Sequence, residues 1–135
     1  MIDPLDALLE AARAASRSAY CPYSRFHVGA AILAGGKVYT GANVENASYG
    51  LTVCAERTAA FAAVLDGVTR FDAIAVACVD APEGSPAEGL MPCGACRQVL
   101  AEFAGPQTPV VVDRVGRLTL ERLLPQAFRL RPPGE

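Results

Sequence analysis

A near-continuous apolar run at residues 71–79 constrains the fold of this chain more than any other segment. Its length is that of one β-strand, and its lack of polar alternation predicts a strand buried on both faces. A strand of this kind needs a covering layer on each side. The run therefore predicts an α/β layered domain with helices on both faces of a central sheet.

The segments around this strand supply the helices and the other strands. Asp3 and Pro4 form a helix start, and leucine and alanine recur at helical spacing until about Ala19. The glycine pair at 35–36 separates residues 26–33 from 37–40 and predicts a β-hairpin, with a loop at 41–51. The remaining patterns predict helices at 54–65 and 93–103, a buried strand at 109–113, and a short strand or helical turn at 118–124.

The size and charge of the chain indicate what it can bind. Its 135 residues suffice for one domain, and we expect 1–135 to form a single domain with frayed ends at 1–3 and 131–135. The formal net charge is −2, without the concentrated basic footprint of a nucleic-acid-binding protein. Neither a signal-peptide pattern nor an apolar stretch of the ~20 residues that span a bilayer is present. We therefore expect a soluble cytoplasmic protein with a small-molecule substrate, no nucleic-acid partner and no membrane association.

The five cysteines, an odd number, indicate free thiols or metal ligands rather than a disulfide framework. Cys93 and Cys96 lie three residues apart at a predicted helix start, so their sulfurs can point at one metal ion. Cys54 begins another predicted helix and adds a third thiolate, which the positive end of a helix favours. Three protein ligands leave a fourth position open for water, as in catalytic zinc sites. We therefore predict Zn²⁺ as the cofactor.

Glu56 and Arg57 follow the first of these cysteines. Glu56 is too close to Cys54 in sequence to be a comfortable second ligand, and we expect it to carry protons between water and substrate. Arg57 is placed to offset the negative charge of a zinc ion with three thiolates by a hydrogen bond to sulfur. A Cys or His ligand before such a glutamate, with Pro-Cys-x-x-Cys downstream, is the signature of zinc deaminases.

A structural zinc site is the alternative interpretation of these cysteines, and it would need a fourth protein ligand. The only histidine, His27, lies inside a predicted strand and has no assigned role. Cys21 and Cys78 are the other candidates. Cys78 is expected to pack as a small apolar residue in its strand, and Cys21 to be a free thiol.

Six blocks, in order along nearly the whole chain, resemble the small homotetrameric cytidine deaminases. They are Tyr-Cys-Pro-Tyr-Ser-Arg-Phe at 20–26, Val-Gly-Ala-Ala at 28–31, Gly-Ala-Asn-Val-Glu-Asn-Ala at 41–47, Cys-Ala-Glu-Arg-Thr-Ala at 54–59, Pro-Cys-Gly-Ala-Cys-Arg-Gln at 92–98 and Leu-Leu-Pro-Gln-Ala-Phe at 123–128. The resemblance implies a three-layer α-β-α domain with a mixed central sheet. It also implies zinc-dependent hydrolytic deamination of cytidine or deoxycytidine in pyrimidine salvage, with Glu56 as the catalytic residue.

The same resemblance implies which residues bind the substrate. Asn43 and Glu45 correspond to the pair that binds the ribose 3′-hydroxyl. Phe26 corresponds to an aromatic residue that packs on the pyrimidine. The backbone N–H of Ala55 corresponds to a donor to the base O2.

Two aromatic residues and one loop bear on assembly and substrate range. Tyr49 and Phe128 correspond to residues that reach a neighbouring subunit's active site, which implies a homotetramer with shared sites. Met91 departs from the Ser or Thr usual before Pro92, and residues 82–90 form a long loop rich in glycine and proline; either could alter the substrate range. The blasticidin-type antibiotic deaminases, which share the Cys-Ala-Glu and Cys-x-x-Cys motifs, are one rival family, and the blocks at 26–31 and 43–46 favour the nucleoside enzyme over them. The polynucleotide-editing deaminases are the other, and they would be expected to have a basic groove, which the charge balance does not show.

Overall fold

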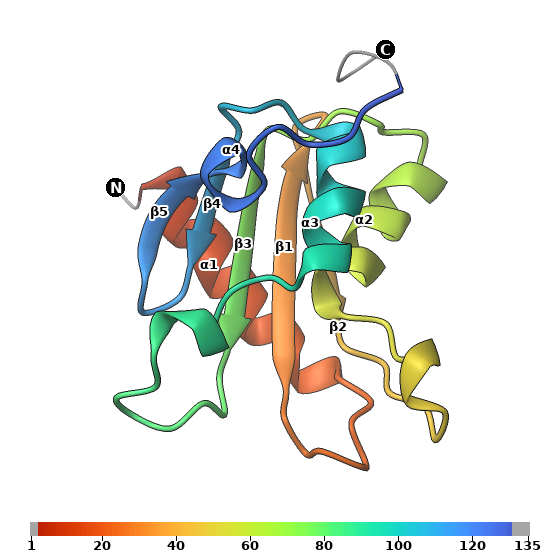
Figure 1. Cartoon of the computed structure of the whole chain (residues 1–135), viewed down its shortest axis with the longest axis vertical. Helices are drawn as coiled ribbons and strands as arrows, with labels where there is room; N and C mark the ends of the chain where they lie inside the picture. The colour runs from red at the N-terminus through yellow and green to blue at the C-terminus, as the bar shows by residue number, and fades with distance from the viewer. Residues whose placement is uncertain (1–2, 131–135) are drawn as a thin grey trace.

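Four α-helices and five β-strands lie along residues 3–130, the part of the chain that this computed structural model describes (Figure 1). The helices are α1 (Pro4–Ala15), α2 (Ala55–Leu65), α3 (Gly94–Phe103) and α4 (Leu120–Leu123). The strands are β1 (Val28–Ala34), β2 (Lys37–Ala42), β3 (Ala73–Cys78), β4 (Pro109–Val112) and β5 (Gly116–Thr119). Short 3-10 turns lie at Ser16–Ser18, Tyr49–Leu51 and Ala87–Gly89. Within this part of the chain no helix is both long and apolar enough to cross a membrane.

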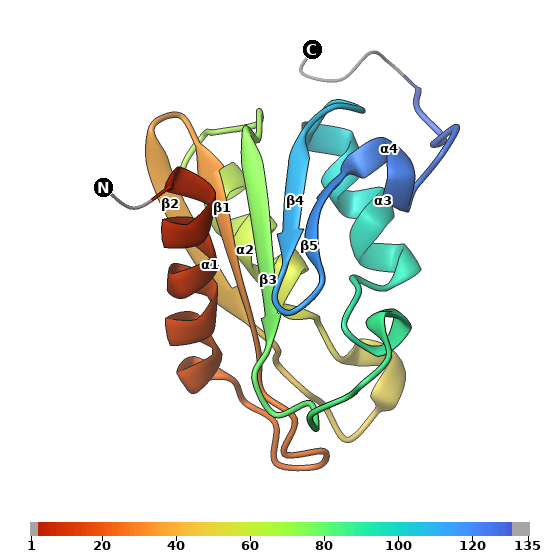
Figure 2. The ribbon, with the colours of Figure 1, turned by 90° about the vertical axis from the view of Figure 1, so that its left-hand side faces the viewer.

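The strands of residues 3–130 form one five-stranded sheet in the order β2-β1-β3-β4-β5. β3 and β4 pair in parallel, whereas the pairs β1–β2, β1–β3 and β4–β5 are antiparallel. α1 covers one face of the sheet, and α2 and α3 cover the other (Figure 2). The predicted three-layer arrangement around a mixed sheet is confirmed.

β3 divides its side chains between two cores, because successive residues of a strand point to opposite faces. Toward α2 and α3 it contributes Ile74, Val76 and Cys78. Toward α1 it contributes Ala73, Ala75 and Ala77. All residues of β3 are buried, as the apolar run predicted.

Two glycines allow helices to approach the β1–β2 hairpin closely. A Cβ at Gly29 would lie 1.8 Å from the carbonyl oxygen of Ala12 in α1. A Cβ at Gly41 would lie 2.4 Å from the backbone nitrogen of Ala59 in α2. A side chain at either position would force the helix backbone away from the sheet. Glycine at these two positions therefore sets the distance of α1 and α2 from the β1–β2 hairpin.

The boundaries of several elements differ from the sequence predictions, and β3 occupies only Ala73–Cys78 of the apolar run at 71–79. α1 ends at Ala15, and the chain continues as a 3-10 turn to Ser18 instead of as helix to about Ala19. β1 begins two residues later than predicted, and β2 ends two residues later. Residues 118–124, predicted as one short strand or helical turn, are divided between β5 and α4.

The chain ends were predicted to fray. Asp3 instead caps α1, because its Oδ1 accepts a hydrogen bond of 2.8 Å from the backbone N–H of Leu5. The rest of that prediction, for residues 1–2 and 131–135, falls outside the described residues.

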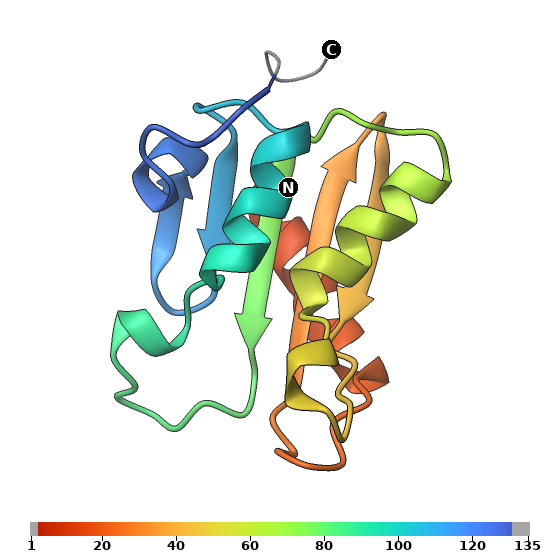
Figure 3. The same ribbon diagram turned by 45° about the vertical axis from the view of Figure 1, so that its right-hand side comes forward.

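α2 and α3 run side by side. Both helices begin at the end of the sheet at which the C-terminus of β3 lies (Figure 3). Their first turns, which carry the Cys-Ala-Glu and Cys-x-x-Cys motifs, therefore face the same end of the molecule. This arrangement brings together two segments that are about forty residues apart in sequence.

Candidate active site

The three predicted zinc ligands meet where α2 and α3 begin. Cys54 is the N-cap residue of α2 and Cys93 the N-cap residue of α3, while Cys96 lies in the first turn of α3. The Sγ atoms of Cys54 and Cys93 are 3.9 Å apart, and those of Cys93 and Cys96 are 3.4 Å apart. Among residues 3–130, these cysteines form the one group of three or more possible metal-ligating side chains whose ligand atoms lie within 4.8 Å of one another.

The spacing of these sulfurs fits one zinc ion. Zinc binds thiolates at about 2.3 Å in tetrahedral geometry, which separates two ligand sulfurs by about 3.8 Å. The observed separations of 3.9 and 3.4 Å require only small side-chain adjustments to reach that value. Three sulfurs occupy three corners of the tetrahedron and leave the fourth for a water or a substrate atom.

Arg57 lies against this cluster. Its Nη2 donates to the Sγ of Cys54 at 3.5 Å and to the carbonyl oxygen of Thr52 at 3.3 Å. A hydrogen bond from the Cys96 thiol, aided by the Arg57 guanidinium, lowers the pKa of Cys54 to about 5. The hydrogen bond to Cys54, followed by burial, raises the pKa of Cys96 in turn. The cluster therefore holds a thiolate at neutral pH, and a thiolate is the form that binds metal.

Glu56 extends into the protein interior from the first turn of α2. Its side chain is 3% exposed. Desolvation is the largest cause that raises the pKa of Glu56 to about 7, and the nearby Cys54 acts in the same direction. A carboxyl with a pKa near 7 accepts and releases protons at little cost at neutral pH, as a general acid and base must.

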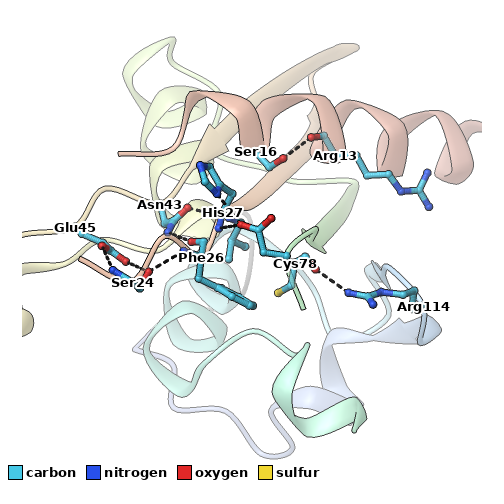
Figure 4. A network of polar contacts seen from close by, with 11 residues as sticks. Arg13, Ser16, Ser24, Phe26, His27, Asn43, Glu45, Cys78 and Arg114 are labelled. Atoms are coloured by element: carbon cyan, nitrogen blue, oxygen red, sulfur yellow. Dashed lines mark hydrogen bonds and ion pairs between the residues drawn. The ribbon is translucent and has the colours of Figure 1, made fainter. Parts of the chain in front are cut away.

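Asn43 and Glu45 join the loop that follows β2 to residues 23–28 by hydrogen bonds (Figure 4). The Oδ1 of Asn43 accepts from the N–H of Val28 at 2.9 Å, and its Nδ2 donates to the carbonyl oxygen of Phe26 at 2.8 Å. The carboxylate of Glu45 accepts from the N–H groups of Tyr23 and Ser24, each at 3.1 Å, and from the Ser24 hydroxyl. These hydrogen bonds, chiefly those with Ser24, lower the pKa of Glu45. Both side chains thus fix the backbone that carries Phe26.

The other predicted contact residues occupy different places. Phe26 is half-buried and packs against the core on the α2–α3 side of the sheet. Ala55 is the first residue of α2, where backbone N–H groups have no partner within the helix. Tyr49 is 81% exposed and lines a cavity of about 110 Å³ together with Glu45.

Phe128 lies beside α3 within this single chain. It is 69% exposed, and its carbonyl oxygen accepts a hydrogen bond of 3.0 Å from Gln98. The next residue, Arg129, donates to the carbonyl oxygens of Ala101 and Ala104 at the C-terminal end of α3. The cysteines lie at the opposite end of that helix.

The remaining cysteines and the histidine take no part in the cluster. Burial raises the pKa of Cys21, and burial raises the pKa of Cys78 to about 11. Cys78 packs in the core, as expected, and its thiol lies 3.8 Å from the carbonyl oxygen of Leu90. His27 precedes β1 instead of lying inside it, and its backbone N–H and Nδ1 contact Asp80 at 2.8 and 2.6 Å. Among the described residues there is thus no fourth ligand of the kind a structural site needs.

Several residues that support the site were missed from the sequence. Ser24 receives the Phe26 N–H at 3.0 Å, and Asp80 holds His27. Arg114 donates to the carbonyl oxygens of Cys78 and Ala81, at 2.8 and 3.0 Å, and so fixes the chain as it leaves β3 (Figure 4). The Ser24–Phe26 bond is local, but the partners of Asp80 and Arg114 lie far away in sequence, so no local spacing signals those contacts.

The long loop at residues 82–90 is anchored before it reaches the cysteines. It contains the 3-10 turn Ala87–Gly89, and Leu90 at its end is buried in the core. Met91 is half-buried and packs against the same core. Met91, which stands where Ser or Thr is usual, therefore adds an apolar contact beside the Pro92–Cys93 turn.

The family profile described as "Cytidine and deoxycytidylate deaminase zinc-binding region" matches residues 3–112. The chain belongs to this deaminase family. It is 46% identical over 129 residues to the cytidine deaminase of Sporosarcina psychrophila, covering 92% of this chain and 90% of the relative. It is 49% identical over 127 residues to the cytidine deaminase of Halalkalibacterium halodurans, covering 90% of this chain and 91% of the relative.

The solved structures support the same family. The crystal structure of cytidine deaminase from Burkholderia pseudomallei superposes with a TM-score of 0.80 at 48% identity, covering 91% of this chain and 98% of the other. A blasticidin-S deaminase from Bacillus cereus is more distant, at 33% identity over 113 residues, 78% of this chain and 79% of the relative. The chain is therefore more similar to these three cytidine deaminases than to that antibiotic deaminase.

Proposed function

We propose that the protein catalyses the zinc-dependent hydrolytic deamination of cytidine, deoxycytidine or both, giving the corresponding uridine nucleoside and ammonia. The observation that carries this proposal is the buried carboxyl of Glu56 beside three thiols that fit one zinc ion. The two cytidine deaminase relatives, each matched over about nine-tenths of its length, support the substrate class.

Cys54, Cys93 and Cys96 would hold the metal, and Glu56 would move the protons. When bound, zinc supplies a Lewis acid that lowers the pKa of a water at the open position. Glu56 accepts a proton from the attacking water and passes it to ring N3 of the pyrimidine. After the water oxygen has added at C4, Glu56 accepts the second proton from the resulting C4 hydroxyl. It delivers this proton to the amine as the C4–N bond breaks and the C4 carbonyl forms. The reaction thereby consumes one water and releases one ammonia.

Asn43 and Glu45 would bind the ribose through donor and acceptor positions that their hydrogen bonds within the protein do not occupy. The Asn43 amide has a second N–H, and each carboxylate oxygen of Glu45 has more than one acceptor position. Because these side chains are already held by the protein, they would meet the 3′-hydroxyl with little loss of side-chain entropy. Phe26 would pack on the pyrimidine, and the Ala55 N–H would donate to O2.

A homotetramer with shared active sites belongs to the same proposal. Tyr49 and Phe128 are large aromatic residues exposed in this chain, and a neighbouring subunit would cover them. The substrate would be a free nucleoside rather than a nucleic-acid strand, because the net charge is −2. A cytoplasmic location and a role in pyrimidine salvage remain expectations that follow from the sequence.

The assay that tests the proposal follows uridine and ammonia release from cytidine, with zinc content measured on the same protein. Glu56→Gln retains the size of the side chain but cannot titrate, so we expect turnover to fall by about 10²–10⁴-fold or more with zinc retained. Glu10→Gln, an exposed position on α1, is the matched control and should leave turnover unchanged.

The outcomes separate the alternatives. Wild-type activity that is lost only in Glu56→Gln supports both the reaction and the role of this carboxyl. Bound zinc without cytidine turnover would contradict the substrate, and blasticidin S and modified cytosines would then be assayed. Absence of both zinc and turnover would contradict the proposal as a whole.

A further inference from the structure

The turn that carries Cys93 is held by Arg97, one helical turn further along α3. The Nε of Arg97 donates to the carbonyl oxygen of Pro92 at 2.8 Å. Its Nη1 donates to the carbonyl oxygen of Leu123 at 2.6 Å. One guanidinium therefore bridges the metal-binding turn and the end of α4.

The Pro92 carbonyl is the part of this turn that most directly sets the direction of Cys93. It belongs to the peptide group that precedes Cys93, so fixing the oxygen fixes the rotation of that peptide plane. The Pro92 ring is itself fully buried, which anchors the other side of the same peptide. Cys93, by contrast, is exposed and lies at the N-cap of α3 without a side-chain capping bond.

The Leu123 carbonyl gives the guanidinium a firm support. Leu123 is the last residue of α4, where carbonyl groups have no partner within the helix. The side chains of Leu120 and Leu123 are buried in the core shared with α3. The contact therefore connects the metal-binding turn to the packed interior instead of to a free loop.

We propose that Arg97 is a positioning residue for the metal site: by bridging the Pro92 and Leu123 carbonyls, it holds Cys93 in the orientation that binds zinc. The planar fork of arginine suits this task, because it presents separate N–H groups to two acceptors in fixed directions. Lysine concentrates its charge at a single nitrogen and cannot reproduce this planar arrangement of two separate donor nitrogens. This inference rests on the zinc site proposed above.

Arg129 provides a matched comparison on the same helix. Its guanidinium also donates to two backbone carbonyls, those of Ala101 and Ala104. These carbonyls lie at the end of α3 remote from the cysteines. Losing either arginine should cost similar packing and hydrogen bonding, but only Arg97 contacts the turn that holds a ligand.

The experiment measures zinc release from the full-length protein to a colorimetric chelator, for wild type, Arg97→Met, Arg97→Lys and Arg129→Met. Loss of a group that orients a metal ligand weakens metal binding by about 10- to 100-fold, and we expect an increase of this order in the release rate of Arg97→Met. Arg97→Lys should fall between Arg97→Met and wild type, and Arg129→Met should release zinc as wild type does. Visible spectra of the Co²⁺-loaded proteins report the sulfur geometry independently of activity, and only the Arg97 variants should change them.

Equal release rates and unchanged Co²⁺ spectra in Arg97→Met and Arg129→Met would overturn the inference. If Arg97→Met does not fold, Arg97→Lys decides, and a wild-type release rate in that variant would also overturn it. A wild-type protein that binds no zinc would overturn the proposed function and this inference with it. That result is distinguishable, because it does not depend on any substitution.

Discussion

Asn43 stabilises the fold by hydrogen bonds to the backbone, and this role can be measured separately from any contact with substrate. Its amide oxygen accepts from the N–H of Val28 at 2.9 Å, and its amide nitrogen donates to the carbonyl oxygen of Phe26 at 2.8 Å. The side chain is 8% exposed, so water cannot readily replace it. In Asn43→Ala, one backbone donor and one backbone acceptor at the start of β1 would lose their partners.

The size of the effect follows from these two bonds. A buried polar group left without a partner costs about 1–3 kcal/mol. In Asn43→Ala two groups lose their partner, the N–H of Val28 and the carbonyl oxygen of Phe26. Part of the cost is recovered because the start of β1 can relax toward solvent. We therefore expect the free energy of unfolding to fall by about 2–4 kcal/mol, a large share of the about 5–15 kcal/mol typical of a domain.

Urea unfolding followed by far-ultraviolet circular dichroism measures this loss directly. Both proteins should be metal-free, because bound zinc would add a binding contribution to the stability. Asn46→Ala is the control: it lies in the same loop, is exposed, and its Oδ1 accepts a single bond of 2.9 Å from the Ser48 N–H. We expect it to cost about 1 kcal/mol or less.

The refuting result is a free energy of unfolding for Asn43→Ala within about 0.5 kcal/mol of wild type, the range of ordinary surface substitutions. The amide would then not be a structural clamp. If the stability loss is as large as expected, a rise in KM for cytidine under conditions where the variant is folded would show the second role as well.

Two further substitutions test the packing and the charge of the site. Gly41→Ala places a Cβ 2.4 Å from the Ala59 nitrogen, so α2 must shift. We expect the free energy of unfolding, measured in urea, to fall by about 1–3 kcal/mol. A urea midpoint equal to that of the wild type would contradict the close approach of α2 to β2. Arg57→Met removes the guanidinium 3.5 Å from the Cys54 sulfur and should weaken zinc affinity by about 10- to 100-fold in competition with a zinc indicator. Unchanged affinity and turnover in Arg57→Met would mean that its charge does not support the thiolates.

The parts of the fold that the sequence predicted are those in which one local pattern determines the structure. Within the run at 71–79, β3 is buried on both faces as predicted, whereas Asp72 and Val79 beside its ends are exposed. The end of α1 could not be predicted, because the helical turn continues in 3-10 form through Ser18 and leaves the apolar spacing almost unchanged. β5 is an edge strand whose first two residues are exposed, so residues 116–119 show little of the alternation that predicts a strand.

The same distinction holds at the site. Cys54, Glu56, Cys93 and Cys96 stand in short motifs, and each motif opens a helix, so their spacing alone predicted a three-thiolate cluster with a neighbouring carboxyl. The bonds that Asn43 and Glu45 make to residues 23–28 were not predicted, because their partners lie on another loop. The contact of Arg97 with Leu123, 26 residues away, is of the same kind. The short motifs thus predicted which residues carry the chemistry. The hydrogen bonds that hold these residues in place became visible only in the folded structure.

The first turn of α2 sets two pKa values in opposite directions. The pKa of Cys54 is lowered to about 5 by Cys96 and then Arg57, whereas desolvation raises the pKa of Glu56 to about 7. Both shifts depend on where this turn sits, because the first needs α3 alongside and the second needs the sheet to exclude water. A displacement of α2 should therefore disturb the thiolate and the proton carrier together. Gly41, which lets α2 approach β2, contributes to the chemistry in this way although it has no side chain.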